Sequence, residues 1–200
     1  MQMIHQPAFT RADPDERRQS LIEATARVLS AKGAAGVSVR TICAEAGVSP
    51  GLLRHYFAGV SEAIAETYRW TGQQIAEALE AAVAMAAPDP RARLLAYITA
   101  SFRAPIADPQ LLASYVALWS LSRSDPQVAL VRAEVYRDFR EGLELLICAY
   151  RPQLRDVRLP AIALTALIDG LWLELSLGDA PFTPEEAEAL AEKWLATVAG

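Results

Sequence analysis

The feature that most constrains this chain is the stretch 38–57, which reads SVRTICAEAGVSPGLLRHYF and encodes two short helices in close succession. The pattern predicts helices over 39–46 and 50–56. Gly47 lies where a tight turn between two helices needs a residue that tolerates positive φ. Ser49 can cap the second helix, and the proline after it suits a first helical position, where no N–H is needed. The stretch therefore predicts a helix-turn-helix unit.

The two predicted helices would bury one face and leave the other in solvent. The apolar side chains spaced to meet between them are Ile42, Ala46, Val48 and Leu53. The outward positions of the second helix are Gly51, Leu52, Arg54, His55 and Tyr56. A helix-turn-helix presents such a face to the major groove of DNA. The sequence thus predicts a surface that contacts double-stranded DNA.

We expect the side chains of this surface to divide between bases and backbone, because base edges specify a sequence whereas phosphates position the protein. Arg54 and His55 are predicted to read or flank base edges. The predicted backbone contacts come from both helices and are Ser38, Arg40, Ser49 and Tyr56.

Composition and chain breaks predict an all-α protein. The 200 residues are 52% apolar, which is ample for a buried core, and no alternating β-branched run occurs. We expect a flexible arm over 1–13, a three-helix helix-turn-helix domain over 14–60 and a helical-bundle domain for ligand binding and dimerisation over 61–200. Prolines and glycines predict further helices over 14–32, 61–87, about 90–103, 109–122, 126–151, 160–177 and from 184 onward.

Net charge is distributed unevenly along the chain. The whole chain carries −5, which by itself argues against a nucleic-acid partner. Residues 1–60 hold seven Lys/Arg against five Asp/Glu, a net of +2, so the remaining residues carry −7. The acidity therefore belongs to the part that is expected to face away from DNA.

Cysteine usage and hydropathy favour a reduced cytoplasmic protein. Cys43 and Cys148 fall in different expected domains, and neither has a second Cys or a His at metal-ligand spacing. The chain does not open on an apolar signal segment, and its most apolar run, 159–173, is interrupted by Asp169 and too short to span a bilayer. We expect no membrane partner, no metal and no cofactor.

An enzyme is not expected, because the reactive side chains are poorly placed for catalysis. His55 and Cys43 are twelve residues apart within the helix-turn-helix stretch. Asp169 and Glu174 are five apart on one expected helix and hence about 140° from each other around its axis. That is poor geometry for a catalytic carboxylate pair.

The run 46–57, AGVSPGLLRHYF, resembles the DNA-binding domain of the TetR family of bacterial transcription regulators. The resemblance implies a ligand-responsive homodimer, a repressor released from its operator by a small molecule. Val60 departs from the pattern, because it stands three residues after Phe57, where these proteins commonly have a phosphate-binding Lys. The alternative is therefore an all-α dimeric interaction module without sequence-specific DNA binding. The residues that argue against this alternative are Arg40, Arg54, His55 and Tyr56.

A second resemblance covers 165–177, TALIDGLWLELSL, and 115–129, YVALWSLSRSDPQVA, which are similar to the regulatory domain of the BetI-type, choline-responsive subgroup. It implies a choline-like or other cationic ligand. The expected ligand-binding side chains are Tyr115, Trp119, Asp169 and Trp172. Each pair is three or four residues apart and shares a helix face, and aromatic rings around a carboxylate can hold a soft cation. The alternative is that the rings are ordinary core and Asp169 caps a helix or pairs with Arg103, Arg137 or Arg140.

The last two expected helices carry surplus apolar surface, which indicates either a two-fold dimer interface or ordinary core packing. Small side chains make a flat strip on the first of these helices, where another helix can approach closely. The residues expected in a dimer interface are Ala163, Ala166, Gly170, Leu190 and Trp194.

Overall fold

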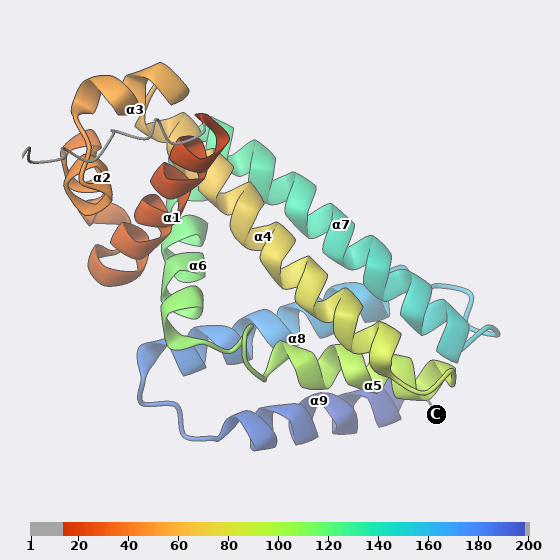
Figure 1. Ribbon diagram of the computed structural model, residues 1–200. Coiled ribbons are helices and arrows are strands. Elements are labelled where there is room, and N and C mark those ends of the chain that lie inside the picture. The colour runs from red at the N-terminus through yellow and green to blue at the C-terminus, as the bar shows by residue number, and fades with distance from the viewer. Residues whose placement is uncertain (1–13, 199–200) are drawn as a thin grey trace, which may run out of the picture.

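The computed structural model describes residues 14–198, and the regular structure in this range is helical, without a strand (Figure 1). The prediction of an all-α chain is therefore confirmed. The expected arm over 1–13 lies outside the described residues. The helices are α1 (Pro14–Lys32), a short 3₁₀ turn η1 (Ala34–Gly36), α2 (Val39–Ala46), α3 (Pro50–Tyr56), α4 (Val60–Met85), α5 (Pro90–Ser101), α6 (Pro109–Ser122), α7 (Pro126–Tyr150), α8 (Arg158–Leu177) and α9 (Pro184–Val198).

These bounds match the predicted ones to within about two residues, and the difference at the start of α8 follows from capping. Helix α8 begins at Arg158, two residues before the proline that was expected to open it. The Asp156 carboxylate accepts the backbone N–H of Arg158 at 2.9 Å and that of Leu159 at 3.4 Å, so it caps the extra residues. Pro160 then lies inside the first turn, where its missing N–H has no cost.

Two apolar clusters organise the described residues. The smaller, which we term the reader cluster, consists of Leu21, Ile22, Ile42, Cys43, Leu53, Phe57 and Ala63. The larger, the main cluster, is formed by the buried apolar side chains of α4 to α9 together with Leu29 of α1. Half-buried Val37 and Val60 pack against both clusters. The helix-turn-helix unit is therefore joined to the bundle by continuous packing.

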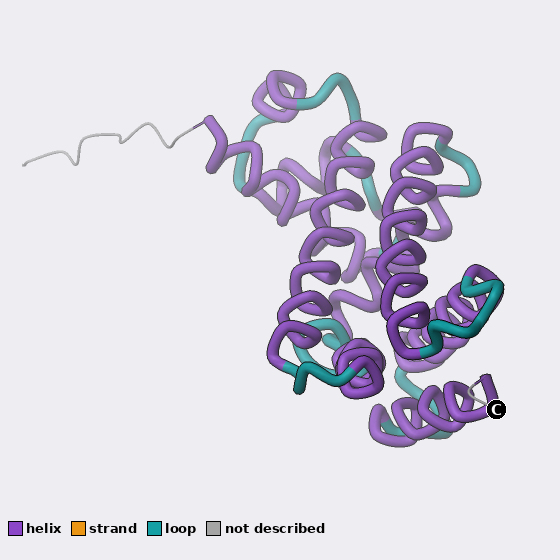
Figure 2. The backbone as a smooth tube through the Cα atoms, turned by 90° about the vertical axis from the view of Figure 1, so that its right-hand side faces the viewer, coloured by secondary structure: helices purple, strands orange, loops and turns teal. Residues whose placement is uncertain are grey.

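Helix α4 runs from the α1–α3 unit along the length of the bundle, beside α7 (Figure 1). The view turned by 90° about the vertical axis shows the same arrangement, with the α1–α3 unit at one end of the molecule (Figure 2). The buried face of α4 supplies Ala63 to the reader cluster and Tyr68, Ile75 and Leu79 to the main cluster. A displacement of α4 would therefore disturb both clusters.

Helices α4 and α7 pack closely at Gly72. A Cβ atom added there would lie 2.9 Å from Cγ1 and 3.0 Å from Cγ2 of Val135, nearer than carbon atoms can pack without a shift. Only glycine fits this crossing. Gly142, further along α7, is different, because a Cβ added there meets no atom within 4 Å.

These two glycines give a matched pair of stability predictions. Gly72→Ala should destabilise the protein, because overpacking costs about 1–3 kcal/mol, and for so short a contact this exceeds the roughly 1 kcal/mol that Ala gains over Gly in a helix. Gly142→Ala, the control, should stabilise it by about 0.5–1 kcal/mol. Urea denaturation measures both changes. Equal stabilisation by both substitutions would show that the α4–α7 crossing relaxes without cost.

Candidate functional site

The helix-turn-helix has the local geometry that its sequence predicts. Gly47 ends α2 with φ 64° and ψ 34°, a left-handed conformation that favours glycine. The Ser49 hydroxyl accepts the Leu52 N–H at 3.4 Å and caps α3. Ser38 caps α2 in a reciprocal arrangement with Thr41, whose hydroxyl accepts the Ser38 N–H at 2.9 Å. Both serines therefore have a structural role at the exposed surface, besides the DNA contacts predicted for them.

The outer face of this unit presents most of the predicted DNA-reading side chains to solvent. Arg40, Gly51, Arg54 and His55 are exposed, as are Ser38 and Ser49. Leu52 is half-buried, and Tyr56 is half-buried against the reader cluster with its ring 5.0 Å from that of His55, edge to face. The Tyr56 ring is thus partly committed to packing, while its neighbours on α3 remain available.

Two arginines of this face have no carboxylate partner. Among residues 14–198, Arg40 and Arg54 form no ion pair, whereas Arg27 bonds Glu45 at 2.7 Å and Arg18 bonds Glu66 at 2.5 Å. An exposed guanidinium without a carboxylate partner is free to meet phosphate or a guanine edge.

Val60 occupies a packing position. As the first residue of α4 it is half-buried and touches both clusters, so an apolar side chain is stabilised there.

A chain of ion pairs connects α1 to the bundle. No pattern along the sequence predicted it, because its members are far apart in the chain. Glu66 of α4 accepts from Arg18 of α1 and also from Arg69, one turn further along. Arg69 reaches Glu134 of α7 at 3.2 Å. The Arg18 guanidinium also lies over the Phe57 ring, 5.2 Å from its centroid. Arg18 therefore holds α1 against both α4 and the end of α3.

Inside the bundle, the rings predicted as a ligand site do come together. Tyr115 is the centre: its ring centroid lies 5.4 Å from that of Trp119 and 5.8 Å from that of Trp172, both edge to face. Tyr68 of α4 adds a third contact at 5.5 Å that the sequence analysis missed. The Trp172 Nε1 donates to the Ser101 carbonyl oxygen at 2.7 Å, which fixes the indole. We term these four rings, with Asp169 and Tyr136, the aromatic chamber.

Asp169 is the charged group of the chamber. The Tyr136 hydroxyl donates to Asp169 Oδ2 at 2.8 Å. Burial raises the pKa of Asp169 to about 6, although the Tyr136 hydrogen bond and the positive charges of Arg132 and Arg140 lower it. The two guanidiniums lie 4.7 Å and 5.8 Å from the Tyr136 ring centroid. The carboxylate therefore lacks a directly bonded cation among the described residues.

The arginines proposed as direct partners of Asp169 mostly bind elsewhere. Arg103 pairs with Glu185 at 3.3 Å and with Glu188 at 2.9 Å. Arg137 reaches Asp138 at 3.3 Å. Arg140 acts on Asp169 only through its charge.

Three further polar atoms of this region are buried without a hydrogen bond among the described residues: Tyr68 Oη, Thr71 Oγ1 and Trp119 Nε1. Burial raises the pKa of the Tyr68 hydroxyl, and the nearby Tyr115 and Trp119 side chains lower it by a smaller amount. Neither of these two contacts has the geometry of a hydrogen bond. A buried polar group without a partner costs about 1–3 kcal/mol. Such groups favour a ligand that can satisfy them.

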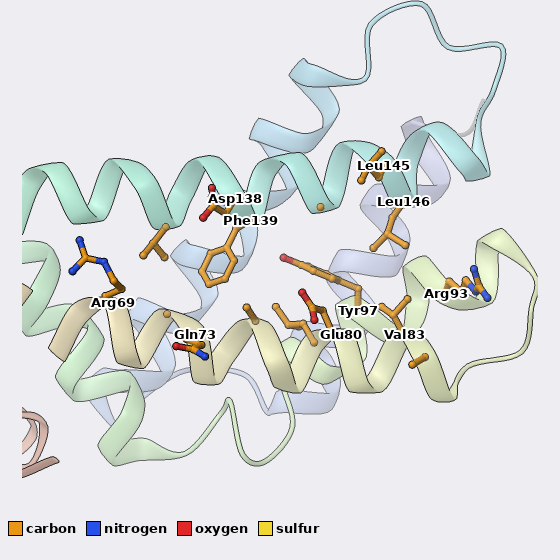
Figure 3. Close-up of a pocket in the computed structure, with 16 residues that line it drawn as sticks. Arg69, Gln73, Glu80, Val83, Arg93, Tyr97, Asp138, Phe139, Leu145 and Leu146 are labelled. Atoms are coloured by element: carbon orange, nitrogen blue, oxygen red, sulfur yellow. The ribbon is translucent and has the colours of Figure 1, made fainter. Parts of the chain in front are cut away.

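A pocket of about 660 Å³ lies between α4, α5 and α7 (Figure 3), and its lining includes no residue of the aromatic chamber. Tyr97 of α5 belongs to its wall, and Figure 3 shows this side chain lying across the pocket with its hydroxyl towards Phe139 and Glu80. None of the four predicted ligand residues lines this pocket. The pattern of the sequence identified the rings but not the cavity, because a cavity depends on how helices distant in sequence diverge.

The predicted dimer strip is exposed on α8. Ala163, Ala166 and Gly170 face solvent, and so do four larger apolar side chains of the same helix: Leu159, Ile162, Leu173 and Leu177. On α9, Leu190 is 45% exposed, whereas Trp194 is half-buried against the main cluster of its own chain. Trp194 is therefore largely a packing residue of the protomer.

These features define a class of protein: a helix-turn-helix regulator whose DNA-binding unit is joined to a helical bundle. No group of three His, Cys, Asp or Glu side chains within 14–198 is arranged to hold a metal. Residues 21–62 match the family model described as bacterial regulatory proteins, tetR family, and residues 90–200 match the BetI-type transcriptional repressor, C-terminal. The chain belongs to the tetR family, with a BetI-type C-terminal region.

Individual proteins agree with this assignment. The chain is 32% identical, over 90% of its length and 87% of the relative, to the HTH-type transcriptional regulator BetI of Rhizobium meliloti (strain 1021). A transcriptional regulator structure from Pseudomonas aeruginosa PAO1 is 37% identical with a TM-score of 0.87, covering 96% of this chain and 94% of that one. The fold also matches, at 19% identity and a TM-score of 0.80, a Saccharomonospora viridis regulator in complex with choline, covering 91% and 96%. Relatives of this chain are thus regulators rather than enzymes.

Proposed function

We propose that this protein is a cytoplasmic, homodimeric repressor that binds operator DNA through α3 and leaves it when a small cationic effector occupies the aromatic chamber. The observation that carries this proposal is the buried Asp169 carboxylate among aromatic rings, in a bundle joined through α4 to a reader with unpaired arginines. Membership of the tetR family supports the regulatory part.

The DNA-binding part rests on the outer face of α3. Arg54 and His55 lie exposed on a helix of the length and position that enters the major groove, and Arg40 of α2 lies beside it. The net charge of +2 over residues 1–60 is small, so the unpaired arginines supply much of the attraction to phosphate.

Arg54→Ala should weaken specific operator binding by about 1–3 kcal/mol, the loss expected for one bidentate base contact. Arg40→Ala should instead weaken binding to all DNA sequences. It should also lower the number of counterions released on binding, measured from the salt dependence of the DNA affinity, by about one. Fluorescence anisotropy with DNA from upstream of the protein's own gene measures both. Arg27→Ala is the control, because Arg27 is already paired with Glu45. Wild-type protein that discriminates no sequence would favour an interaction module without specific DNA binding.

The dimeric part rests on the exposed apolar face of α8. Length and composition alone would let this helix cross a membrane. Asp169 in its middle is hydrogen-bonded to Tyr136, and its other face packs against α6 and α7, so we assign it to the bundle. A second copy of the same face, with Leu190 of α9, would remove these apolar side chains from water.

Gly170→Arg should produce monomers and abolish operator binding together, because a charged side chain would interrupt the flat strip and two readers are needed for a two-fold operator. A Cβ at Gly170 meets no atom within 4 Å in the protomer, so the fold itself should tolerate the change. Analytical ultracentrifugation and anisotropy measure the two effects. Gly142→Arg, an equally exposed helical glycine on α7, should stay dimeric. A Gly170→Arg dimer would place the interface elsewhere.

The effector part rests on the unsatisfied polarity of the chamber. A quaternary ammonium group would pair with Asp169 and meet ring faces, both of which favour a cation in a desolvated site. The chamber is closed, with Tyr115 only 2% exposed, so a ligand must separate the rings. Tyr68, one of these rings, belongs to α4, so this separation would move the helix that begins beside the helix-turn-helix. The Arg18–Glu66 pair then connects that movement to α1.

Choline should bind more tightly than its uncharged carbon isostere, dimethylbutanol, in isothermal titration. Because the cation pairs with ionised Asp169, whose pKa is about 6 without ligand, affinity should be full above pH 7 and fall as pH drops through 6, with proton release on binding. Asp169→Asn should lose the preference for the cation and the pH dependence. Glu174→Gln, an exposed neutralisation on the same helix, is the control. Equal affinities for the two compounds would contradict the cation site.

A further inference from the structure

The end of the bundle opposite the helix-turn-helix carries a local excess of positive charge. The turn between α4 and α5 and the loop between α7 and α8 both lie at this end (Figure 1), and Figure 2 shows both of them again away from the α1–α3 unit. Residues 85–93 and 150–159 together hold five arginines against two aspartates, a net of +3. Because residues 61–200 carry −7 in total, the rest of that range carries −10. Positive charge is therefore gathered at one end of an acidic domain.

Four arginines of this end are exposed and form no ion pair among residues 14–198. We term them the distal arginine patch: Arg91, Arg93, Arg155 and Arg158. The two aspartates of the same segments cap helices instead. Asp89 accepts the Ala92 N–H at 2.8 Å, and Asp156 accepts the Arg158 N–H at 2.9 Å. The four guanidiniums are therefore left to solvent or to an anion outside the chain.

Two of these arginines occupy positions that are unfavourable for a cation in the protein alone. Arg91 is the second residue of α5 and Arg158 the first of α8, so both lie at the positive end of a helix dipole. Neither helix has an acidic residue in its first turn, whereas α1, α4 and α9 do. Residues that break a local stability rule without compensation in the fold mark functional positions. An external anion would supply that compensation.

We propose that the distal arginine patch binds the phosphate backbone of a second DNA segment, so that the protein bridges two duplexes. A guanidinium can donate two parallel hydrogen bonds to one phosphate, and all four members of the patch are arginines. The patch lies at the opposite end of the molecule from α3, so a duplex held there is not the operator segment under the reader (Figure 1). The contact is independent of sequence, because phosphates carry no base information. It goes beyond the proposed function, which uses one DNA segment.

An anionic membrane surface is the alternative polyanion, and the side chains of this end favour DNA. Peripheral membrane segments combine basic residues with aromatic and large apolar side chains that enter the lipid. The aromatic side chain of 150–159, Tyr150, is half-buried, and the Arg151 guanidinium lies 5.0 Å from its ring centroid. Leu159 belongs to the α8 face proposed for dimerisation. Met85 is 88% exposed, but a single exposed apolar side chain needs no partner.

A capture assay tests the proposal. DNA from upstream of the protein's own gene is immobilised and saturated with protein, and a labelled duplex of unrelated sequence is then added. The wild type should capture this second duplex. With four phosphate contacts, capture per bound protein should weaken roughly 50-fold between about 50 and 150 mM salt, because affinity falls with about the 0.9 power of salt for each contact.

The test variants are two double substitutions within the patch: Arg91→Gln with Arg93→Gln, and Arg155→Gln with Arg158→Gln. Each should lower the number of counterions released on capture by about two. Both should bind the immobilised DNA as the wild type does. Both should also melt no lower than the wild type, because the removed charges include those that the helix dipoles disfavour. The control, Arg123→Gln with Arg137→Gln, removes the same charge from exposed positions outside the patch and should keep capture.

Three results would overturn the second DNA site, and each leaves the proposed operator binding standing. The first is protein that holds the immobilised DNA but captures no second duplex, or capture that both patch variants keep. The second is capture that the Arg123 and Arg137 control loses as fully as the patch variants, because the response would then follow overall charge. The third is patch-dependent binding to phosphatidylglycerol vesicles without capture of DNA, which would assign the patch to a membrane surface.

Discussion

The structure depends above all on the burial of α4 in two separate apolar clusters. One end of this helix closes the reader cluster through Ala63, and the rest crosses the main cluster through Tyr68, Ile75 and Leu79. Gly72 permits the close approach to α7 that this requires. Since close-packed interiors shift between discrete arrangements rather than deform continuously, a ligand that displaces α4 in the bundle must also change its contacts with α1 and α3.

The aromatic chamber shows why such a displacement is feasible. It holds a carboxylate whose pKa burial raises, together with polar atoms of Tyr68 and Trp119 that lack hydrogen bonds among the described residues. These groups make the closed chamber less stable than an apolar core of the same size would be. A ligand that satisfies them offsets the cost of opening the rings. Ion pairs at the surface, such as Arg18–Glu66, contribute little stability singly, but they connect α1 to α4.

Sequence patterns predicted the parts of this protein whose causes are local. Gly47, Ser49 and Ser38 act through turn and capping geometry within a few residues, so their positions could be read along the chain. The Tyr115–Trp119 pair followed from a spacing of four on one helix. The start of α8 was wrong by two residues, because the Asp156 cap was not anticipated. The roles of the DNA-reading, ligand and dimer residues stay predictions.

What the sequence determined by itself was the all-α class, the helix-turn-helix and two side-chain pairs of the chamber, Tyr115–Trp119 and Asp169–Trp172, because helical periodicity, capping and turn residues act over short distances. Only the tertiary structure decided that Tyr136 rather than an arginine bonds Asp169, that Tyr68 completes the ring cluster and that a pocket opens between α4, α5 and α7. These features join residues on different helices. Their positions depend on crossing distances such as that at Gly72, which periodicity along one helix does not contain.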